Sequence, residues 1–151
     1  MNPNVISVSP EMPLLEAAKI IAEHKFDGVP VVTTDNVLVG ILTEYDLISK
    51  GSSVHLPTLH TILQNLSVFQ KDQSHFKKEV ENIASLRVKD VMNSDPLILS
   101  DEATLEEVVQ AFREHHRVNP IPVVDKEHNV VGVVSRFDVL KPFGLVQSLN
   151  N

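Results

Sequence analysis

Apolar residues near the N-terminus recur at the spacing of a helix. They lie three or four positions apart between Leu14 and Lys25, which predicts one amphipathic helix over residues 14–25. Two short runs rich in β-branched residues follow, 29–33 and 37–42, separated by the polar pair Asp35-Asn36. This alternation of apolar runs and a polar turn predicts two strands joined as a hairpin. The apolar helix face consists of Leu14, Ala17, Ala18, Ile21 and Ala22.

The same order of predicted elements returns in the second half of the chain. A helical pattern covers residues 104–115, where Thr104 and Glu107 have the spacing of a capping box. Strand-like runs follow at 121–124 and 130–134, around a polar turn at 127–129. A short helix should complete each unit, with Gly51 and Pro142 as the stop signals.

The two halves also match residue by residue. Leu14-Leu15-Glu16 aligns with Leu105-Glu106-Glu107 at an offset of 91 positions, and the later matches hold at 92. Each unit is therefore predicted to run strand, helix, strand, strand, helix. Neither unit can bury both faces of its sheet alone, so we expect an α/β (α+β) pair with pseudo-twofold symmetry and a shared core. The later matched segments are Val29-Pro30-Val31-Val32 with Ile121-Pro122-Val123-Val124, and Gly40 to Leu47 with Gly132 to Val139.

The repeat sets the expected domain boundaries. The first unit spans residues 1–50 and the second spans 88–142, with a tail at 143–151. Helical spacing within the intervening segment, 51–87, predicts two amphipathic helices, near 59–66 and 76–83, which either pack back on the units or form a surface for a partner. The counterpart of Val88–Val91 would precede Met1, so the chain is either naturally short there or a piece of a longer polypeptide.

Each unit ends in a polar motif of possible chemical importance. Thr43 is followed three positions later by Asp46, and Ser135 by Asp138, in both cases where a strand passes into a helix. A helix N-terminus offers N–H groups to a phosphate, and a carboxylate can accept hydrogen bonds from ribose hydroxyls. The same spacing also makes an ordinary helix cap, so both interpretations remain open.

These motifs carry a resemblance to a known family. The apolar-Pro-apolar-apolar strand, followed by Gly, two apolar residues, Thr or Ser, two further residues and Asp, resembles the CBS domain, and its duplication resembles a CBS domain pair, or Bateman module. The resemblance implies that the Asp holds ribose, that the hydroxyl approaches phosphate, and that backbone around the Val-Pro strand borders adenine. Carried over, it implies one site at Thr43, Asp46, Val29 and Pro30, and another at Ser135, Asp138, Ile121 and Pro122.

The two motifs differ in charge at one position. Arg136 occupies the place that Glu44 has in the first copy. A guanidinium beside a phosphate is favourable and a carboxylate there is repulsive, so the second site is predicted to take the more phosphorylated ligand. The first site would then prefer a less anionic ligand such as adenosine or S-adenosylmethionine. The alternative for Arg136 is a pairing with a surface acid.

Composition excludes several classes of protein. With 13 Lys and Arg against 20 Asp and Glu, the net charge is −7, which opposes binding of a nucleic-acid polymer. The chain has no cysteine, and adjacent His115 and His116 cannot share a metal on one helix face, so no metal site is expected. No nucleophile or oxyanion hole accompanies the acidic residues, so no catalytic residue is assigned. The aromatic residues expected in the core are Phe26, Phe112, Phe137 and Tyr45, the last two as possible cleft residues.

Together these features predict a non-catalytic regulatory module. The resemblance implies that it binds AMP, ADP, ATP or S-adenosylmethionine in clefts between its two units, with no cofactor required for folding or chemistry. The resemblance also implies a homodimer. No effector domain is recognised in the sequence, so an effector protein or a fused domain is expected to respond to the ligand. The lack of cysteine and of a long apolar run favours a cytoplasmic setting away from membranes. The alternative is a ligand-free scaffold that presents the insertion helices to a partner.

Overall fold

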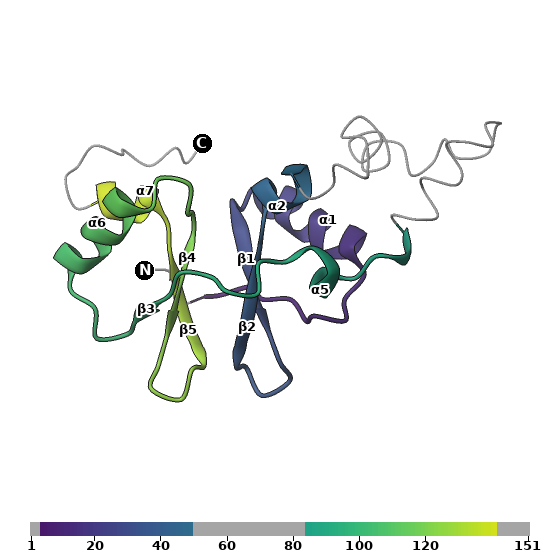
Figure 1. The fold of residues 1–151 in the computed structure, drawn as a ribbon, viewed down its shortest axis with the longest axis horizontal. Coiled ribbons are helices and arrows are strands. Elements are labelled where there is room, and N and C mark those ends of the chain that lie inside the picture. The colour runs from purple at the N-terminus through teal and green to yellow at the C-terminus, as the bar shows by residue number, and fades with distance from the viewer. Residues whose placement is uncertain (1–3, 50–83, 142–151) are drawn as a thin grey trace.

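The computed structural model describes residues 4–49 and 84–141, which form two similar halves side by side (Figure 1). Each half is built around one β-hairpin with helices on its outer side. The predicted helices near 59–66 and 76–83, both stop signals and the tail lie outside the described residues. The elements are α1 (Leu14–His24), β1 (Gly28–Val32), β2 (Leu38–Thr43), α2 (Glu44–Ser49), α5 (Val88–Val91), β3 (Leu99–Ser100), α6 (Leu105–Glu114), β4 (Ile121–Val124), β5 (Val130–Val134) and α7 (Arg136–Leu140).

The predicted helices of both units are confirmed. Leu14, Ala17 and Ile21 of α1 are buried, as the apolar spacing requires. At the start of α6, Thr104 accepts a hydrogen bond from the Glu107 amide, and the Glu107 carboxylate accepts one from the Thr104 amide at 2.7 Å. These hydrogen bonds from Thr104 lower the pKa of Glu107, and the capping box therefore forms as predicted.

Both predicted hairpins are present with equivalent registers. Strand β1 pairs antiparallel with β2, and β4 pairs antiparallel with β5. At the hairpin turns, Asn36 and His128 have positive φ values of 65° and 69°, the left-handed region that Asn and His adopt more readily than most residues. The first predicted strand of each unit is shorter than expected: β3 has two residues parallel to β4, and the first unit has a single parallel bridge, Val8 with Val31.

The tips of the two hairpins pack on each other and join the halves. A buried cluster contains equivalent residues from both units, Val32 and Leu38 from the first, Val124 and Val130 from the second. Two backbone hydrogen bonds related by the pseudo-twofold axis accompany it. Leu38 N–H donates to the His128 carbonyl at 3.1 Å, and Val130 N–H donates to the Asn36 carbonyl at 3.2 Å. The predicted shared core with pseudo-twofold symmetry is thus observed.

The segment before the second unit's β3 packs on the first unit. Val88 and Val91 of α5 are buried in the core that α1, β1 and β2 form. Asn93 exchanges two backbone hydrogen bonds with Ile41 of β2, both 2.9 Å long. Gly40 permits this approach, because a Cβ there would lie 2.8 Å from the Asn93 carbonyl oxygen. Residues at the start of the second repeat in sequence therefore complete the first repeat in space.

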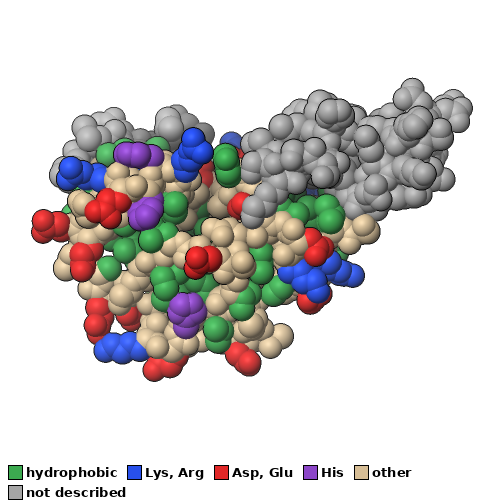
Figure 2. All heavy atoms as spheres, viewed as in Figure 1, with side chains coloured by type: hydrophobic (Ala, Val, Ile, Leu, Met, Phe, Trp, Pro, Cys, Tyr) green, Lys and Arg blue, Asp and Glu red, His purple; other side chains and the backbone are tan. Residues whose placement is uncertain are grey.

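Every helix within the described residues is too short or too polar to cross a lipid bilayer. On the face shown in Figure 2, acidic side chains gather along the left and lower rim, and others lie within the face with basic side chains nearby.

Truncation of the inter-unit core should unfold the pair more readily. Leu38 is 5% exposed and Leu105 is 52% exposed. We expect Leu38→Ala to lower the free energy of unfolding by about 2–4 kcal/mol, because it leaves a cavity where the two units meet. Leu105→Ala, the same chemical change at the surface, should cost about 0.5 kcal/mol or less. Urea unfolding followed by circular dichroism measures both, and equal losses would contradict the shared-core account.

Candidate functional site

A cavity of about 340 Å³ opens between the two units, within the size range of small-molecule sites. The first unit contributes the end of β2 and the start of α2. The second unit contributes the segment after α5 and the loop that enters β4. The lining residues are Ile41, Thr43, Tyr45, Asp46, Asn93, Pro96, Leu97, Arg117, Val118, Asn119 and Pro120.

This lining groups the first motif with residues of the other unit, whereas the resemblance implied a grouping with strand residues of the same unit. Thr43 and Asp46 line the cavity, but Val29 and Pro30 do not. Both are buried inside β1. Residues 117–120 of the other unit line the cavity beside Thr43 and Asp46. The physical reason is the pseudo-twofold packing, which brings the end of one hairpin against the loop leading into the other. Ile121 and Pro122 are likewise buried in β4.

Thr43 and Asp46 form a tight mutual cap at the start of α2. Asp46 Oδ2 accepts from the Thr43 hydroxyl at 2.7 Å and from the Thr43 N–H at 3.0 Å, while the Asp46 N–H donates to Thr43 Oγ1. The Glu44 N–H donates to the Asp27 carbonyl. These three N–H groups are therefore used within the protein, and the expectation that they would be open to a phosphate is corrected. The helix-cap interpretation describes what is seen, with Asp46 only 6% exposed.

The second motif repeats this cap and adds an ion pair. Asp138 Oδ2 accepts from the Ser135 hydroxyl and the Ser135 N–H, both at 2.9 Å. Lys141 Nζ lies 2.7 Å from Asp138 Oδ1. Burial alone would raise the pKa of Asp138, but the hydrogen bonds from Lys141 and Ser135 outweigh it and hold the pKa below its ordinary value. Ser135, Arg136 and Asp138 do not line the described cavity.

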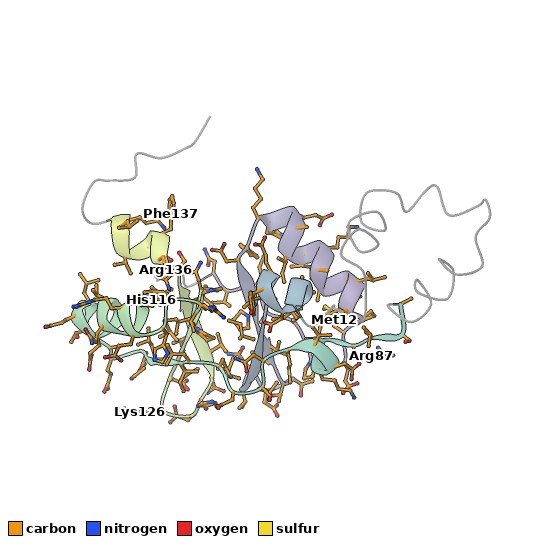
Figure 3. All side chains as sticks on the ribbon, turned by 45° about the horizontal axis from the view of Figure 1, so that its top comes forward. Met12, Arg87, His116, Lys126, Arg136 and Phe137 are labelled. Carbon is orange, nitrogen blue, oxygen red and sulfur yellow. The ribbon has the colours of Figure 1, made fainter. Side chains whose placement is uncertain are left out.

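Arg136 has a different role from the one its charge suggested. Its guanidinium donates to the backbone carbonyls of His115 at 3.0 Å and His116 at 2.7 Å, and it lies over the Phe112 ring at 5.1 Å from the centroid. Figure 3 shows Arg136 beside His116 at the end of α6. The alternative of pairing with an acid is wrong for the described residues, because the guanidinium caps the C-terminal end of a helix, where carbonyls lack partners. Its place beside a phosphate stays a prediction.

Asn119 connects the two motifs across the pseudo-twofold axis. Its Nδ2 donates to Asp27 Oδ2 at 2.7 Å, and its Oδ1 accepts from the Arg136 N–H at 3.0 Å. Asp27 in turn accepts the Glu44 N–H on its carbonyl oxygen. Asp27 and Asn119 occupy equivalent repeat positions, 92 residues apart. The starts of α2 and α7 are thus linked through one side-chain pair.

The aromatic residues divide between core and surface. Phe112 is buried, as expected, whereas the core placement of Tyr45 and Phe137 is wrong, because they are 58% and 53% exposed. Both follow directly on the capped strand ends, where the chain turns outward. Tyr45 lines the cavity, which agrees with its alternative assignment as a cleft residue.

Sequence reasoning missed the residues that the second unit supplies to this cavity, Arg117 and Asn119 above all. A signal was present: Lys25 precedes Arg117 by 92 positions, so a cation recurs at the same place in each repeat. Among the described residues, no group of three or more His, Asp or Glu side chains could hold a metal ion.

A comparison with known families matches the CBS domain at residues 1–53 and 88–143. The chain belongs to the CBS domain family. The two matched segments correspond to the two halves of the structure, and the segment between them lies outside the family's pattern. The recognised resemblance to a CBS domain pair and the predicted fold class are therefore confirmed.

Curated relatives of this CBS pair differ widely in length. An uncharacterized protein of Methanocaldococcus jannaschii is 26% identical over 85% of this chain and 79% of its own length. The chloroplastic CBS domain-containing protein CBSX1 of Arabidopsis thaliana is 27% identical over 89% of this chain, which spans only 57% of CBSX1. Inosine-5′-monophosphate dehydrogenase of Aquifex aeolicus is 30% identical, but the match covers 22% of that enzyme.

Solved CBS pairs share the fold. The crystal structure of CBSX2 in complex with AMP superposes with a TM-score of 0.70 at 23% identity, covering 95% of this chain and 91% of that one. The CBS domain pair of protein MJ0100, in complex with 5′-methylthioadenosine and S-adenosyl-L-methionine, gives a TM-score of 0.66 at 22% identity, covering 95% and 94%.

The Asn119–Asp27 pair can be tested by exchanging its partners. Asn119→Asp should lower the free energy of unfolding by about 1–2 kcal/mol, because it removes the donor and places two carboxylates in contact. Asp27→Asn combined with Asn119→Asp restores one amide and one carboxylate and should recover most of the loss. Urea unfolding of the two single variants and the double variant measures the coupling; purely additive effects would contradict the contact.

The Asp138 cap should make stability depend on pH. Because the pKa of Asp138 is lowered in the folded state from its ordinary 3.8, its contribution is present above about pH 4 and is lost as the pH falls through the lower folded value. Asp138→Asn should therefore cost about 1 kcal/mol at pH 6, and this difference should shrink towards pH 3. Asp95→Asn, at an exposed carboxylate, controls for the loss of one negative charge. A difference independent of pH would overturn the assignment.

Proposed function

We propose that this CBS pair is a non-catalytic regulatory module that binds an adenosine-containing ligand in the cavity between its units. The observation that supports this most is the shared lining of the cavity, with Thr43 and Asp46 from one unit and Asn93 and residues 117–120 from the other. A ligand in such a cavity contacts both units at once. Its binding therefore favours one arrangement of the pair over others, which is the requirement for a regulatory signal.

The chemistry of the lining suits a nucleoside. Ile41, Leu97 and Val118 offer apolar surface for a base, and the exposed Tyr45 ring can stack on it. The Asp46 carboxylate and the amides of Asn93 and Asn119 supply the polar groups that a ribose requires. The solved CBS pairs crystallised with AMP, or with 5′-methylthioadenosine and S-adenosyl-L-methionine, support adenosine as the common part of the ligand.

A change in the arrangement of the two units has an effect only if another domain responds to it. We propose that this effector is a separate protein or a domain fused to the pair. We also propose that the pair acts as a homodimer in the cytoplasm. The similarity to inosine-5′-monophosphate dehydrogenase covers about a fifth of that enzyme and transfers no catalytic step to this chain. CBS pairs are generally regulatory and non-catalytic, and this supports a role for the chain in binding ligand rather than in turnover.

Ligand binding can be measured by thermal unfolding with AMP, ADP, ATP and S-adenosylmethionine, and with GMP as the base-specificity control. A ligand at 100 times its dissociation constant should add about 2.7 kcal/mol. For a chain of 151 residues this corresponds to a rise in Tm of about 5–10 °C.

Asp46→Ala and Asp138→Ala form a matched pair, since both remove the same cap but only Asp46 lines the cavity. Asp46→Ala should abolish most of the ligand-induced rise in Tm, and Asp138→Ala should retain the part that comes from this cavity. If no ligand raises the Tm of the unaltered chain, and denatured protein releases no nucleotide in mass spectrometry, the sensor function is wrong and a ligand-free scaffold takes its place.

A further inference from the structure

The first unit has a cover that the second unit lacks among the described residues. In the first unit α5 lies against α1 (Figure 1), and Val88 and Val91 share a buried cluster with Leu14 at the start of α1. Leu14 is therefore only 5% exposed, whereas its repeat equivalent, Leu105 at the start of α6, is 52% exposed. The second unit thus presents apolar surface at the place where α5 packs on the first.

The backbone groups that hold α5 on the first unit recur in the second. In the second unit these groups are the N–H of Leu105 and the carbonyls of Asp101 and Ala103, and none of the three has a hydrogen-bond partner within residues 4–49 and 84–141. A further segment can therefore add here the hydrogen bonds that α5 makes on the first unit. Those bonds are Leu14 N–H to the Leu86 carbonyl at 2.9 Å, and Val88 N–H to the Met12 carbonyl and Lys89 N–H to the Pro10 carbonyl, both at 3.0 Å.

The charges around this face favour a basic segment. In the first unit Lys89 Nζ lies 2.8 Å from the Glu11 carboxylate. The repeat keeps this acid as Glu102, which forms an exposed ion pair with Lys126 at 3.0 Å. An exposed pair of this kind is weak, and a carboxylate can accept hydrogen bonds from a second cation. Since Glu106, directly after Leu105, is exposed as well, the face suits a segment that carries Lys or Arg.

A need for both apolar and basic residues separates the possible sources of such a segment. Residues 142–151, which follow α7 in the sequence, contain no Lys or Arg. In a second copy of the chain, the segment 86–92 has the required pattern, but it is packed on that copy's own first unit. The charge complementarity therefore favours a segment of another protein.

We propose that this face of the second unit, with Leu105 at its centre and Glu102 at its edge, is a docking surface for a short basic and apolar segment of a partner protein. The bound segment completes the second unit as α5 completes the first. This assignment stands on the packing of the two repeats and does not depend on the adenosine-containing ligand. The segment has the α5 pattern, with apolar residues at the places of Leu86, Val88 and Val91 and basic residues at the places of Arg87 and Lys89.

A synthetic peptide with the sequence of residues 84–94 is the probe, because it already has this pattern. Fluorescence anisotropy of the labelled peptide should show binding to the full chain at concentrations below about 1 mM. Leu105→Glu should weaken this binding about tenfold or more, because it places a carboxylate where an apolar side chain would be buried. Phe137→Glu is the matched control, at a similarly exposed residue whose equivalent, Tyr45, lies outside the α5 cluster. It should change the affinity less than about twofold at physiological ionic strength.

A charge exchange tests the ionic part of the contact. Glu102→Lys should weaken binding of the peptide about twofold to fivefold, and a peptide carrying Lys89→Glu should recover part of this loss on the Glu102→Lys chain. In NMR spectra the amide signal of Leu105 should shift when the peptide binds, because the equivalent N–H of Leu14 donates to the segment before α5 in the first unit.

Three results would overturn the assignment. If the peptide does not bind, or if Leu105→Glu leaves its affinity unchanged, this face docks no such segment. If the peptide binds only after Phe143→Ser and Leu145→Ser are combined, the C-terminal residues of the chain itself occupy the face. If the chain self-associates and Leu105→Glu abolishes the self-association, the occupant is a second copy. Nucleotide binding is measured separately by thermal unfolding, so its failure leaves this assignment standing.

Discussion

The packing of two hairpin tips on each other is the constraint on which the rest of this molecule depends. Val32 and Leu38 meet their repeat equivalents Val124 and Val130 in a small buried cluster, and paired backbone hydrogen bonds run beside it. Once the tips are joined, the opposite ends of the hairpins face the other unit. There β2 ends at Thr43, beside the loop that enters β4, and the cavity between the units is the result.

Close to the pseudo-twofold axis a residue contacts its own repeat equivalent. Two identical charged side chains would repel each other there. Identical repeats would bring two carboxylates together at positions 27 and 119. The chain has Asp27 and Asn119 instead, so one side donates and the other accepts, and repulsion becomes a hydrogen bond of 2.7 Å. The same divergence separates Glu44 from Arg136: the first side chain is exposed, whereas the second ties the end of α6 to the start of α7. Departures from the repeat are therefore where the two halves acquire separate roles.

The negative net charge of the chain affects the binding of a polyanion to the surface differently from the binding of a single nucleotide in the cavity. A net charge of −7 disfavours a polyanion, whose many phosphates would meet the acidic rim, but a single nucleotide experiences mainly the groups that line its site. There, Asp46 is stabilised by its cap and Arg117 faces the cavity. Since residues of both units surround that space, ligand binding and the relative placement of the units are energetically linked.

The sequence alone determined the repeated units, both hairpins, the helices α1 and α6 with the Thr104 capping box, and the shared core, because these follow from local periodicity and from the need of each half to cover its sheet. It also singled out Thr43 and Asp46. Only the tertiary structure decided which other residues join them, since the loop containing Arg117 lies more than 70 positions away and reaches the cavity through the pseudo-twofold packing. The tertiary structure likewise decided the role of Arg136. The acceptors of its guanidinium are backbone carbonyls at a helix end, and every residue has a backbone carbonyl, so the sequence cannot indicate which ones it will contact.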